Sequence, residues 1–85
     1  MSRQKDGEKL RPVSLSDQAC EYIKTYISQH ELRPRDKLPS EGELSDMLGV
    51  NRLTVRMALQ RLNTLGIIET KVGEGSFVRD FSIMP

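Results

Sequence analysis

Apolar residues recur at helical spacing between residues 49 and 66, and this pattern predicts one complete helix. At about 100° per residue, the apolar side chains fall within roughly a third of the circumference, as expected for a face turned toward a core. They are Val55, Ala58, Leu59, Leu62 and Leu65. Asn51 can cap the first turn with its side-chain oxygen, and Gly66 stands where a left-handed residue would end the last turn. We therefore expect a helix over residues 51–65.

The opposite arc of this helix is polar and carries Arg52, Arg56, Gln60 and Asn63. Two arginines one turn apart near the start of a surface helix suit a charged, grooved partner, a polyanion. This interpretation expects both guanidinium groups to face outward, away from the protein's own carboxylates.

A first helix is predicted to begin near residue 14 and to run for about 14 residues. Its apolar positions are Ala19, Ile23, Tyr26 and Ile27. Either Ser14 or Ser16 can cap its start. Cys20 lies beside the apolar face, which favours a small, half-buried filler over a reactive thiol. His30 stands alone near the helix end, and no second ligand is spaced to make it a metal site.

A connector over residues 32–39 leads to a short second helix. Pro34 and Pro39 disfavour helix at the residue before each of them, and Lys37 with Leu38 could add a short edge strand. Ser40 and Glu43 form a capping-box pattern, and Gly49 stops the helix. Its apolar face comprises Leu44, Met47 and Leu48. We interpret Met47 and Met57 as gap-filling core residues.

The next helix follows this one almost at once, and two short helices joined by a tight glycine-containing turn form a helix-turn-helix unit. Past Gly66 the period changes from helical to alternating, which predicts a hairpin with strands at 67–72 and 76–81 and a turn at 73–75. We expect Phe77 to fold over the helices, with Ser76 and Val78 on the other face. No helix follows Gly75, so the turn is interpreted as a hairpin tip and not as a phosphate-binding loop.

Length and charge limit the function. Eighty-five residues make one small domain with little room for a catalytic cleft. Thirteen Lys and Arg against 12 Asp and Glu leave a net charge of +1, so a positive surface must come from local arrangement. One His and one Cys without metal-ligand spacing offer no catalytic set, so we expect no enzyme, metal or cofactor. The absence of a signal-peptide pattern and of a membrane-span pattern favours the cytoplasm.

The chain is expected to divide into a flexible arm at 1–12, a winged helix-turn-helix domain at 13–80 and the start of a linker at 81–85. The arm carries Arg3, Lys5, Lys9 and Arg11 with Leu10 as its one large apolar residue, and such a segment cannot bury enough surface to order itself. A mildly basic arm can add phosphate contacts, but a solvated terminus is the favoured interpretation.

Three motifs carry a family resemblance. They are Leu38-Pro39-Ser40-Glu41 with Glu43-Leu44, Gly49-Val50-Asn51-Arg52 with Thr54-Val55-Arg56 and Ala58-Leu59, and Gly73-Glu74-Gly75-Ser76-Phe77-Val78. Together they resemble the amino-terminal domain of GntR-family bacterial transcription factors over about residues 15–79. The resemblance implies an α+β, mainly α, winged helix-turn-helix fold with three helices and a two-stranded hairpin wing.

The resemblance also implies a function and partners. Members of the family are mostly repressors, in which this domain precedes a larger domain that binds a small-molecule effector and dimerises the protein. Because the sequence stops at Pro85, we expect a truncated chain, with a slight lean toward the FadR-type branch from residues 15–19. The implied partner is double-stranded DNA with a palindromic operator, bound by a homodimer of the full-length protein.

The family's DNA contacts carry over to nine positions. Arg52 and Arg56 resemble base-reading arginines, and Asn51 and Thr54 match contacts to phosphates or base edges. Leu53 is placed to touch a thymine methyl group, and Ser40 matches a phosphate contact at a helix start. The remaining positions lie at the wing, expected at the minor groove over residues 72–76. They are Lys71, Gly73 and Gly75.

Three residues differ from the family pattern in ways that lower the expected affinity for DNA. Gly42 replaces an arginine that many family members place on DNA, and Val72 and Glu74 occupy wing positions where polar or basic residues are commoner. We therefore expect weak operator binding with a shallow dependence on salt. The alternative is a winged-helix protein-interaction module, which the small net charge and acidic wing tip would suit. The exposed Arg52, Arg56, Gln60 and Asn63 favour DNA over that alternative.

Overall fold

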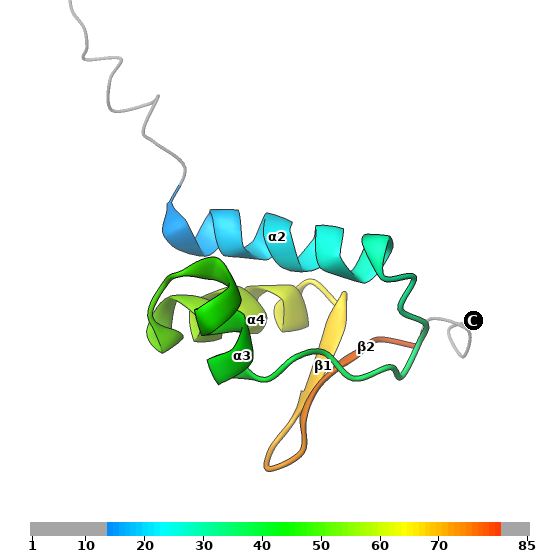
Figure 1. The fold of residues 1–85 in the computed structure, drawn as a ribbon. Helices are drawn as coiled ribbons and strands as arrows, with labels where there is room; N and C mark the ends of the chain where they lie inside the picture. Colours follow the sequence, from blue (N-terminus) through cyan, green and yellow to red (C-terminus); the bar gives the residue numbers. More distant parts are fainter. Residues whose placement is uncertain (1–13, 81–85) are drawn as a thin grey trace, which may run out of the picture.

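The computed structural model describes residues 14–80, which form three helices and a two-stranded antiparallel sheet (Figure 1). The elements are α2 (Leu15–Gln29), α3 (Glu41–Leu48), α4 (Arg52–Thr64), β1 (Ile68–Lys71) and β2 (Gly75–Val78). The arm expected at 1–12 and the linker expected at 81–85 lie outside the described residues. The fold class predicted from the sequence, a winged helix-turn-helix, is confirmed.

Local capping explains where the helices begin. Ser14 caps α2 by accepting a hydrogen bond from the backbone N–H of Asp17 at 3.1 Å. At α3, the Ser40 hydroxyl accepts from the Glu43 N–H at 3.0 Å, while the Glu43 carboxylate accepts from the Ser40 N–H at 2.7 Å. Asn51 caps α4 through a 2.8 Å bond from the Thr54 N–H. Each cap satisfies backbone donors that the first turn leaves without a partner.

Glycines in the left-handed region end two of the helices as expected. Gly49 has a φ of 70° and closes α3, and its N–H donates to the Ser45 carbonyl at 2.9 Å. Gly66, with a φ of 81°, follows the last turn of α4. Side chains rarely tolerate such φ values, whereas glycine adopts them at little cost. The turn at Gly49 brings α4 directly after α3, which completes the helix-turn-helix unit.

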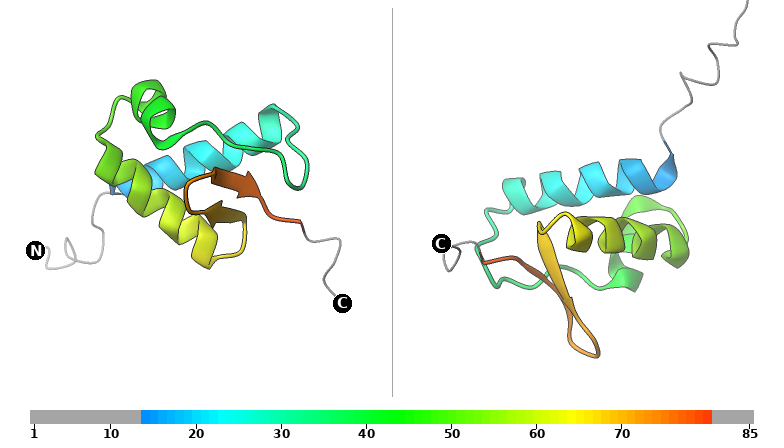
Figure 2. Two further views of the ribbon diagram at one scale, coloured as in Figure 1. Left: turned by 90° about the horizontal axis from the view of Figure 1, so that it is seen from below. Right: turned by 180° about the vertical axis from the view of Figure 1, so that it is seen from behind.

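The core lies where α2 crosses α4, with α3 and the base of the hairpin closing its sides (Figures 1 and 2). It is built from Ala19, Cys20, Ile23, Leu38, Leu44, Val55, Ala58, Leu59, Leu62 and Ile68, all buried. Cys20 is more deeply buried than expected, at 4% exposure, and its thiol donates to the Ala58 carbonyl. Burial raises the pKa of the Cys20 thiol, which fits an inert filler.

The hairpin, which we call the wing, is paired at its base with a third chain segment, residues 36–38. β1 and β2 pair with Ile68 opposite Val78 and Lys71 opposite Gly75. On the other edge of β2, the Leu38 N–H donates to the Ser76 carbonyl and the Val78 N–H donates to the Asp36 carbonyl, both at 2.8 Å. The edge pairing expected at Lys37 and Leu38 is therefore present as a bridge from Lys37 to Phe77.

Three sequence predictions about burial are wrong. Leu65 is 63% exposed, because α4 ends at Thr64 and Leu65, the C-cap residue, no longer continues the buried face of the helix. Met47 and Met57 are not core fillers, since they are 45% and 49% exposed. The faces of the wing are inverted: Ser76 is buried and Phe77 lies on the outer face, because the register places Ser76 and Val78 on the same face as the fully buried Ile68.

Candidate nucleic-acid interface

α4 lies along one side of α2, and the wing projects on the side of the molecule away from α2 (Figure 1). The polar side chains expected on the outer arc of α4 are exposed: Arg52, Arg56, Gln60 and Asn63. The opposite face of the helix is held in the core by Val55, Ala58, Leu59 and Leu62. We call α4 the recognition helix.

Arg56 forms a two-pronged ion pair with Glu41, at the first residue of α3. Its Nε donates to Oε2 of Glu41 at 3.0 Å and its Nη2 donates to Oε1 at 2.9 Å. The hydrogen bonds from Arg56 lower the pKa of the Glu41 carboxyl, and the same contact raises the pKa of Arg56. The expectation that both arginines stay away from the protein's own carboxylates is therefore wrong for Arg56.

The ion pair occupies one edge of the Arg56 guanidinium. A guanidinium carries five N–H donors arranged along its edges, and Glu41 engages Nε and Nη2. The hydrogens of Nη1 and the second hydrogen of Nη2 are directed along a different edge of the same plane. Glu41 thus fixes the plane of the group while a second pair of donors remains able to meet an acceptor outside the protein.

Arg52 lies across Gly42. A Cβ atom added to Gly42 would sit 2.8 Å from Nη2 and 3.2 Å from Cζ of Arg52. Arg52 also adds a small electrostatic contribution to the lowered pKa of Glu41. The glycine that departs from the family motif therefore removes one expected arginine but leaves the space that the Arg52 guanidinium occupies.

The capping residues keep donors for a ligand. Ser40 is exposed, and its hydroxyl accepts from the Glu43 N–H, yet an accepting hydroxyl can still donate its own hydrogen. The Asn51 side chain uses its oxygen on Thr54 and keeps its amide N–H₂ group as a donor. Leu53 is 59% exposed and Thr54 is half-buried. All four lie at a helix start, where backbone N–H groups favour anions.

The tip of the wing consists of Val72, Gly73 and Glu74, and we call these residues the wing tip. Val72 is 99% exposed, and Gly73, with a φ of 78°, has no atom within 4 Å of the position that a Cβ would take. Lys71 Nζ lies 5.2 Å from the centroid of the Phe77 ring, a cation–π contact. The wing tip therefore presents backbone, one apolar side chain and one carboxylate.

A groove between the recognition helix and the wing gathers five of the nine predicted contact residues. They are Ser40, Arg56, Lys71, Gly73 and Gly75. Asn51, Arg52, Leu53 and Thr54 do not line this groove and instead surround the exposed first turn of α4. The predicted residues thus form two adjoining parts of one face.

Sequence reasoning missed two residues of this groove. Lys37 lies across the wing, with its Cε 2.9 Å from the position of a Cβ on Gly75, which has a φ of 122°. Glu41 holds Arg56 across 15 positions of sequence. A basic residue three positions before the capping serine was a visible signal for Lys37, whereas no local pattern pairs Glu41 with Arg56.

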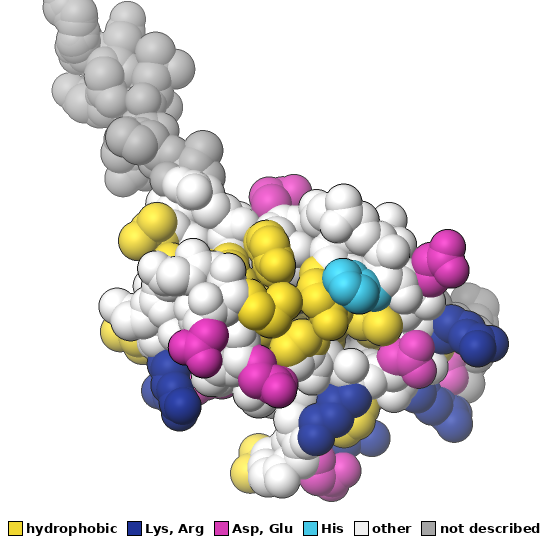
Figure 3. All heavy atoms as spheres, in the orientation of Figure 1, with side chains coloured by type: hydrophobic (Ala, Val, Ile, Leu, Met, Phe, Trp, Pro, Cys, Tyr) yellow, Lys and Arg dark blue, Asp and Glu magenta, His cyan; other side chains and the backbone are white. Residues whose placement is uncertain are grey.

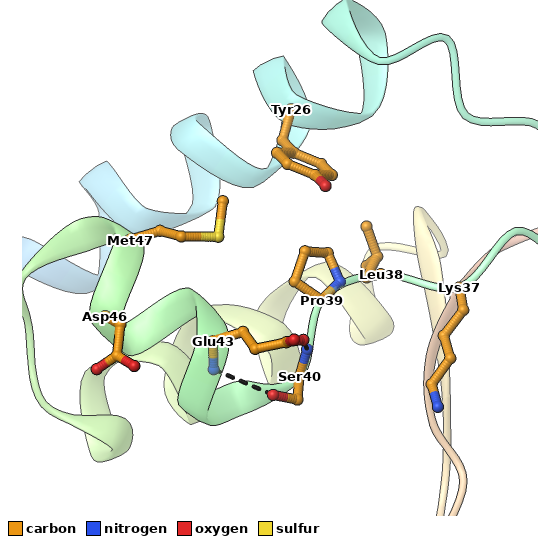
Figure 4. A pocket seen from close by; sticks show the side chains of 8 residues that line it. All are labelled: Tyr26, Lys37, Leu38, Pro39, Ser40, Glu43, Asp46 and Met47. Carbon is orange, nitrogen blue, oxygen red and sulfur yellow. Dashed lines mark hydrogen bonds between the residues drawn. The ribbon is translucent and has the colours of Figure 1, made fainter.

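A second hollow lies between α2, α3 and the connector, on the face shown in Figure 3. Figure 4 shows the apolar side chains of Tyr26, Leu38, Pro39 and Met47 around it, with Glu43 and Asp46 on α3 beside them. His30 stacks on Tyr26 with ring centroids 3.9 Å apart. Of the nine predicted contact residues, Ser40 alone lines this hollow, which adjoins the groove described above through Lys37, Pro39 and Ser40.

Residues 14–80 contain no group of three His, Cys, Asp or Glu side chains arranged to hold a metal ion. None of the helices in this part of the chain is both long and apolar enough to cross a membrane.

A family model described as "Bacterial regulatory proteins, gntR family" matches residues 15–78. The chain belongs to the gntR family. This match covers all three helices and both strands, and it confirms the resemblance drawn from the sequence motifs. The FadR-type branch stays a prediction.

The curated relatives that match this chain are longer than the chain itself. The HTH-type transcriptional regulator Mce2R of Mycobacterium tuberculosis is 41% identical over 75 residues, covering 85% of this chain and 31% of the relative. The HTH-type transcriptional repressor NagR of Bacillus subtilis is 40% identical over 70 residues, covering 82% of this chain and 29% of the relative. The chain therefore spans less than a third of either relative.

Among solved structures, the DNA-binding domain of AraR in complex with operator ORR3 has a TM-score of 0.73 and 34% identity. The match covers 80% of this chain and 82% of that one. This gntR-family chain is thus similar, over nearly all of its described residues, to a domain solved on DNA.

Proposed function

We propose that this domain binds double-stranded DNA sequence-specifically, with the recognition helix in the major groove and the wing at the adjacent minor groove. The observation that carries the proposal is the Arg56 guanidinium, held along one edge by Glu41 while further donors remain for a base. The AraR domain, which was solved with its operator, supports the same partner.

The chemistry of each contact follows from its donors. Arg56 is suited to guanine, because paired guanidinium donors match the O6 and N7 acceptors in the major groove. Ser40 and Thr54 supply hydroxyls for phosphate oxygens, and Lys37 and Lys71 supply charge near the wing. Leu53 offers an apolar surface to a thymine methyl group. Base readout is thus concentrated on α4, with backbone contacts on either side.

We infer that the longer protein is a cytoplasmic, effector-responsive repressor that acts as a homodimer on a palindromic operator. The names of the relatives support regulation of transcription, and NagR is named a repressor. A small-molecule effector would bind in a part of the protein outside this chain. The role proposed for the domain itself is binding and not catalysis.

Selection of binding sites from a random pool of duplex DNA tests the proposal, followed by fluorescence anisotropy on the enriched site. Arg56→Ala should cost about 1–3 kcal/mol in binding and relax the preference at one base position. Arg61→Ala is the matched control, because Arg61 lies on the same helix but pairs with Asp17 of α2. Its loss should leave base preference unchanged.

Two results would contradict the proposal. A pool that enriches no sequence would refute sequence-specific binding by this domain. Equal losses for Arg56→Ala on every duplex would reduce Arg56 to a phosphate contact and remove the observation on which the proposal is based.

A further inference from the structure

Two apolar side chains lie on the outward side of the recognition helix, next to Gln60. Leu53 and Leu62 are nine positions apart, which at about 100° per residue places them on opposite sides of α4. Leu62 is fully buried, so Leu53 points directly away from the core, and it is 59% exposed. Met57, one turn later on the same side, is 49% exposed. We call Leu53 and Met57 the outer ridge.

The outer ridge lies beside the base-reading arginine. Arg56 projects about 60° to one side of Leu53 around the helix, and Met57 projects about 40° to the other side. Arg56 is drawn toward α3 by Glu41, so the space in front of Leu53 and Met57 is not covered by its guanidinium. A duplex that seats Arg56 on a base therefore also meets the outer ridge.

We propose that Met57 is a specificity-determining residue that, together with Leu53, reads thymine methyl groups next to the base contacted by Arg56. The inference rests on the proposed function and identifies the bases that the domain selects. The 5-methyl of thymine is the distinctive apolar group on the major-groove edge, whereas cytosine presents an N4–H₂ donor, for which Leu53 has no acceptor and Met57 has only its weakly accepting sulfur. Methionine is unbranched and flexible, so it can follow the groove floor.

The spacing of the outer ridge fits neighbouring base pairs. Side chains four residues apart on a helix have Cβ atoms about 5–6 Å apart. Successive bases of one strand are about 3.4 Å apart along the duplex axis. The pair therefore spans one to two base steps, and we expect thymine at two positions that are adjacent or separated by one base pair in each half-site.

Replacing thymine by deoxyuridine tests this directly, because the exchange removes the 5-methyl group and leaves the pairing edge intact. On the enriched duplex, each thymine would be replaced in turn and the affinity of the 85-residue chain measured by anisotropy. Loss of one buried methyl contact should weaken binding about fourfold. Met57→Ala and Met57→Gln should abolish the penalty at one thymine, and Leu53→Ala should abolish it at another.

Leu65→Ala is the matched control. Leu65 is also an exposed leucine, at 63%, but it is the C-cap residue of α4 and lies past the last turn of that helix. This substitution should leave every deoxyuridine penalty unchanged. Thermal unfolding of the variants checks that the fold is kept, and Met57→Gln preserves the length of the side chain.

Failure of this inference is distinguishable from failure of the proposed function. If a site is enriched and bound but Met57→Ala retains every deoxyuridine penalty, or if the site holds no thymine within two steps of the Arg56 base, then Met57 does not read thymine. If no site is enriched, sequence-specific binding itself is refuted.

Discussion

The recognition helix and the wing tip border the same groove but are held in contrasting ways. α4 is anchored by four buried side chains, by the Asn51 cap and by the Glu41 ion pair on Arg56. The wing tip has an almost fully exposed Val72, a positive-φ glycine and an exposed Glu74. Arg56, which we propose reads a base, is therefore preorganised, whereas the tip offers mainly backbone whose position its own side chains do not fix.

The largest difference between the two regions is expected in the free energy of unfolding when a side chain on the buried face of α4 is shortened. Leu62→Ala removes a fully buried side chain, and we expect it to lower the free energy of unfolding by about 2–5 kcal/mol. Val72→Ala, at the tip, should change it by less than about 0.5 kcal/mol. Urea unfolding followed by circular dichroism measures both. Comparable losses for the two variants would show that the tip is as firmly packed as the helix.

A second experiment asks whether Glu41 orients Arg56. Glu41→Ala should reduce the ratio of specific to non-specific binding about fivefold, because a freed arginine must lose rotamer entropy on contacting a base. The loss should disappear in an Arg56→Ala background, where no guanidinium is left to orient. Glu41→Gln is the control, since it removes the same charge but keeps one acceptor. An equal fall for Glu41→Ala in both backgrounds would argue against orientation.

The next largest expected effect is on the stability of the domain when the capping box of α3 is removed. Ser40→Ala should destabilise the domain by about 1 kcal/mol, because the Glu43 N–H loses its partner at the helix start. Ser40→Asp keeps an acceptor and should restore stability while placing a carboxylate where phosphate is expected. Thermal unfolding and anisotropy together separate the two roles. Full DNA affinity in Ser40→Asp would remove Ser40 from the phosphate contacts.

The acidic wing tip is expected to limit the dependence of binding on salt. Glu74→Lys should replace repulsion by one phosphate contact and steepen the slope of log K against log salt by about 0.9. Glu21→Lys makes the same charge change on α2, where Glu21 pairs with Lys24, and should alter the slope far less. Anisotropy titrations at several salt concentrations compare them. Identical slopes would place the wing tip away from the phosphates.

The smallest expected effect is on acid stability. Hydrogen bonds from Arg56 lower the pKa of Glu41 below its ordinary value of 4.5. Its contribution is therefore fully present above that ordinary value and is lost as the pH falls through the lowered one. Since the pair is partly exposed, the contribution is small. In melting curves between neutral and acid pH, Glu41→Gln should lose less stability on acidification than the unmodified chain does.

Predictions that depend on local chemistry succeeded. The caps at Ser40 and Asn51 and the stops at Gly49 and Gly66 are each determined by a few neighbouring residues, and all four are in the structure, as is Ser14, one of the two serines expected to cap the first helix. A side-chain oxygen at a helix start and a glycine at its end act within one turn. These local signals were sufficient to locate the helix-turn-helix unit.

The predictions that failed depend on distant partners, although the distant edge pairing expected at Lys37 is present. Periodicity showed which side of α4 is apolar, but it could not show that Leu65 lies past the end of the packed region or that Met57 lies outside it. The inverted faces of the wing follow from strand register, which Ile68 determines by packing into the core. The ion pair of Glu41 and Arg56 joins residues on two different helices, and charge alone does not identify such pairs.

The segment that lies along β2 links early and late parts of the chain. Asp36 and Leu38 find their hydrogen-bond partners in residues 76–78, about forty positions later. The chain is synthesised from its amino end, so all three helices are made before that partner strand exists. Completion of the fold must therefore wait until nearly the whole domain has been synthesised, and a chain that ends just before residue 76 would leave the Leu38 N–H and the Asp36 carbonyl without these partners.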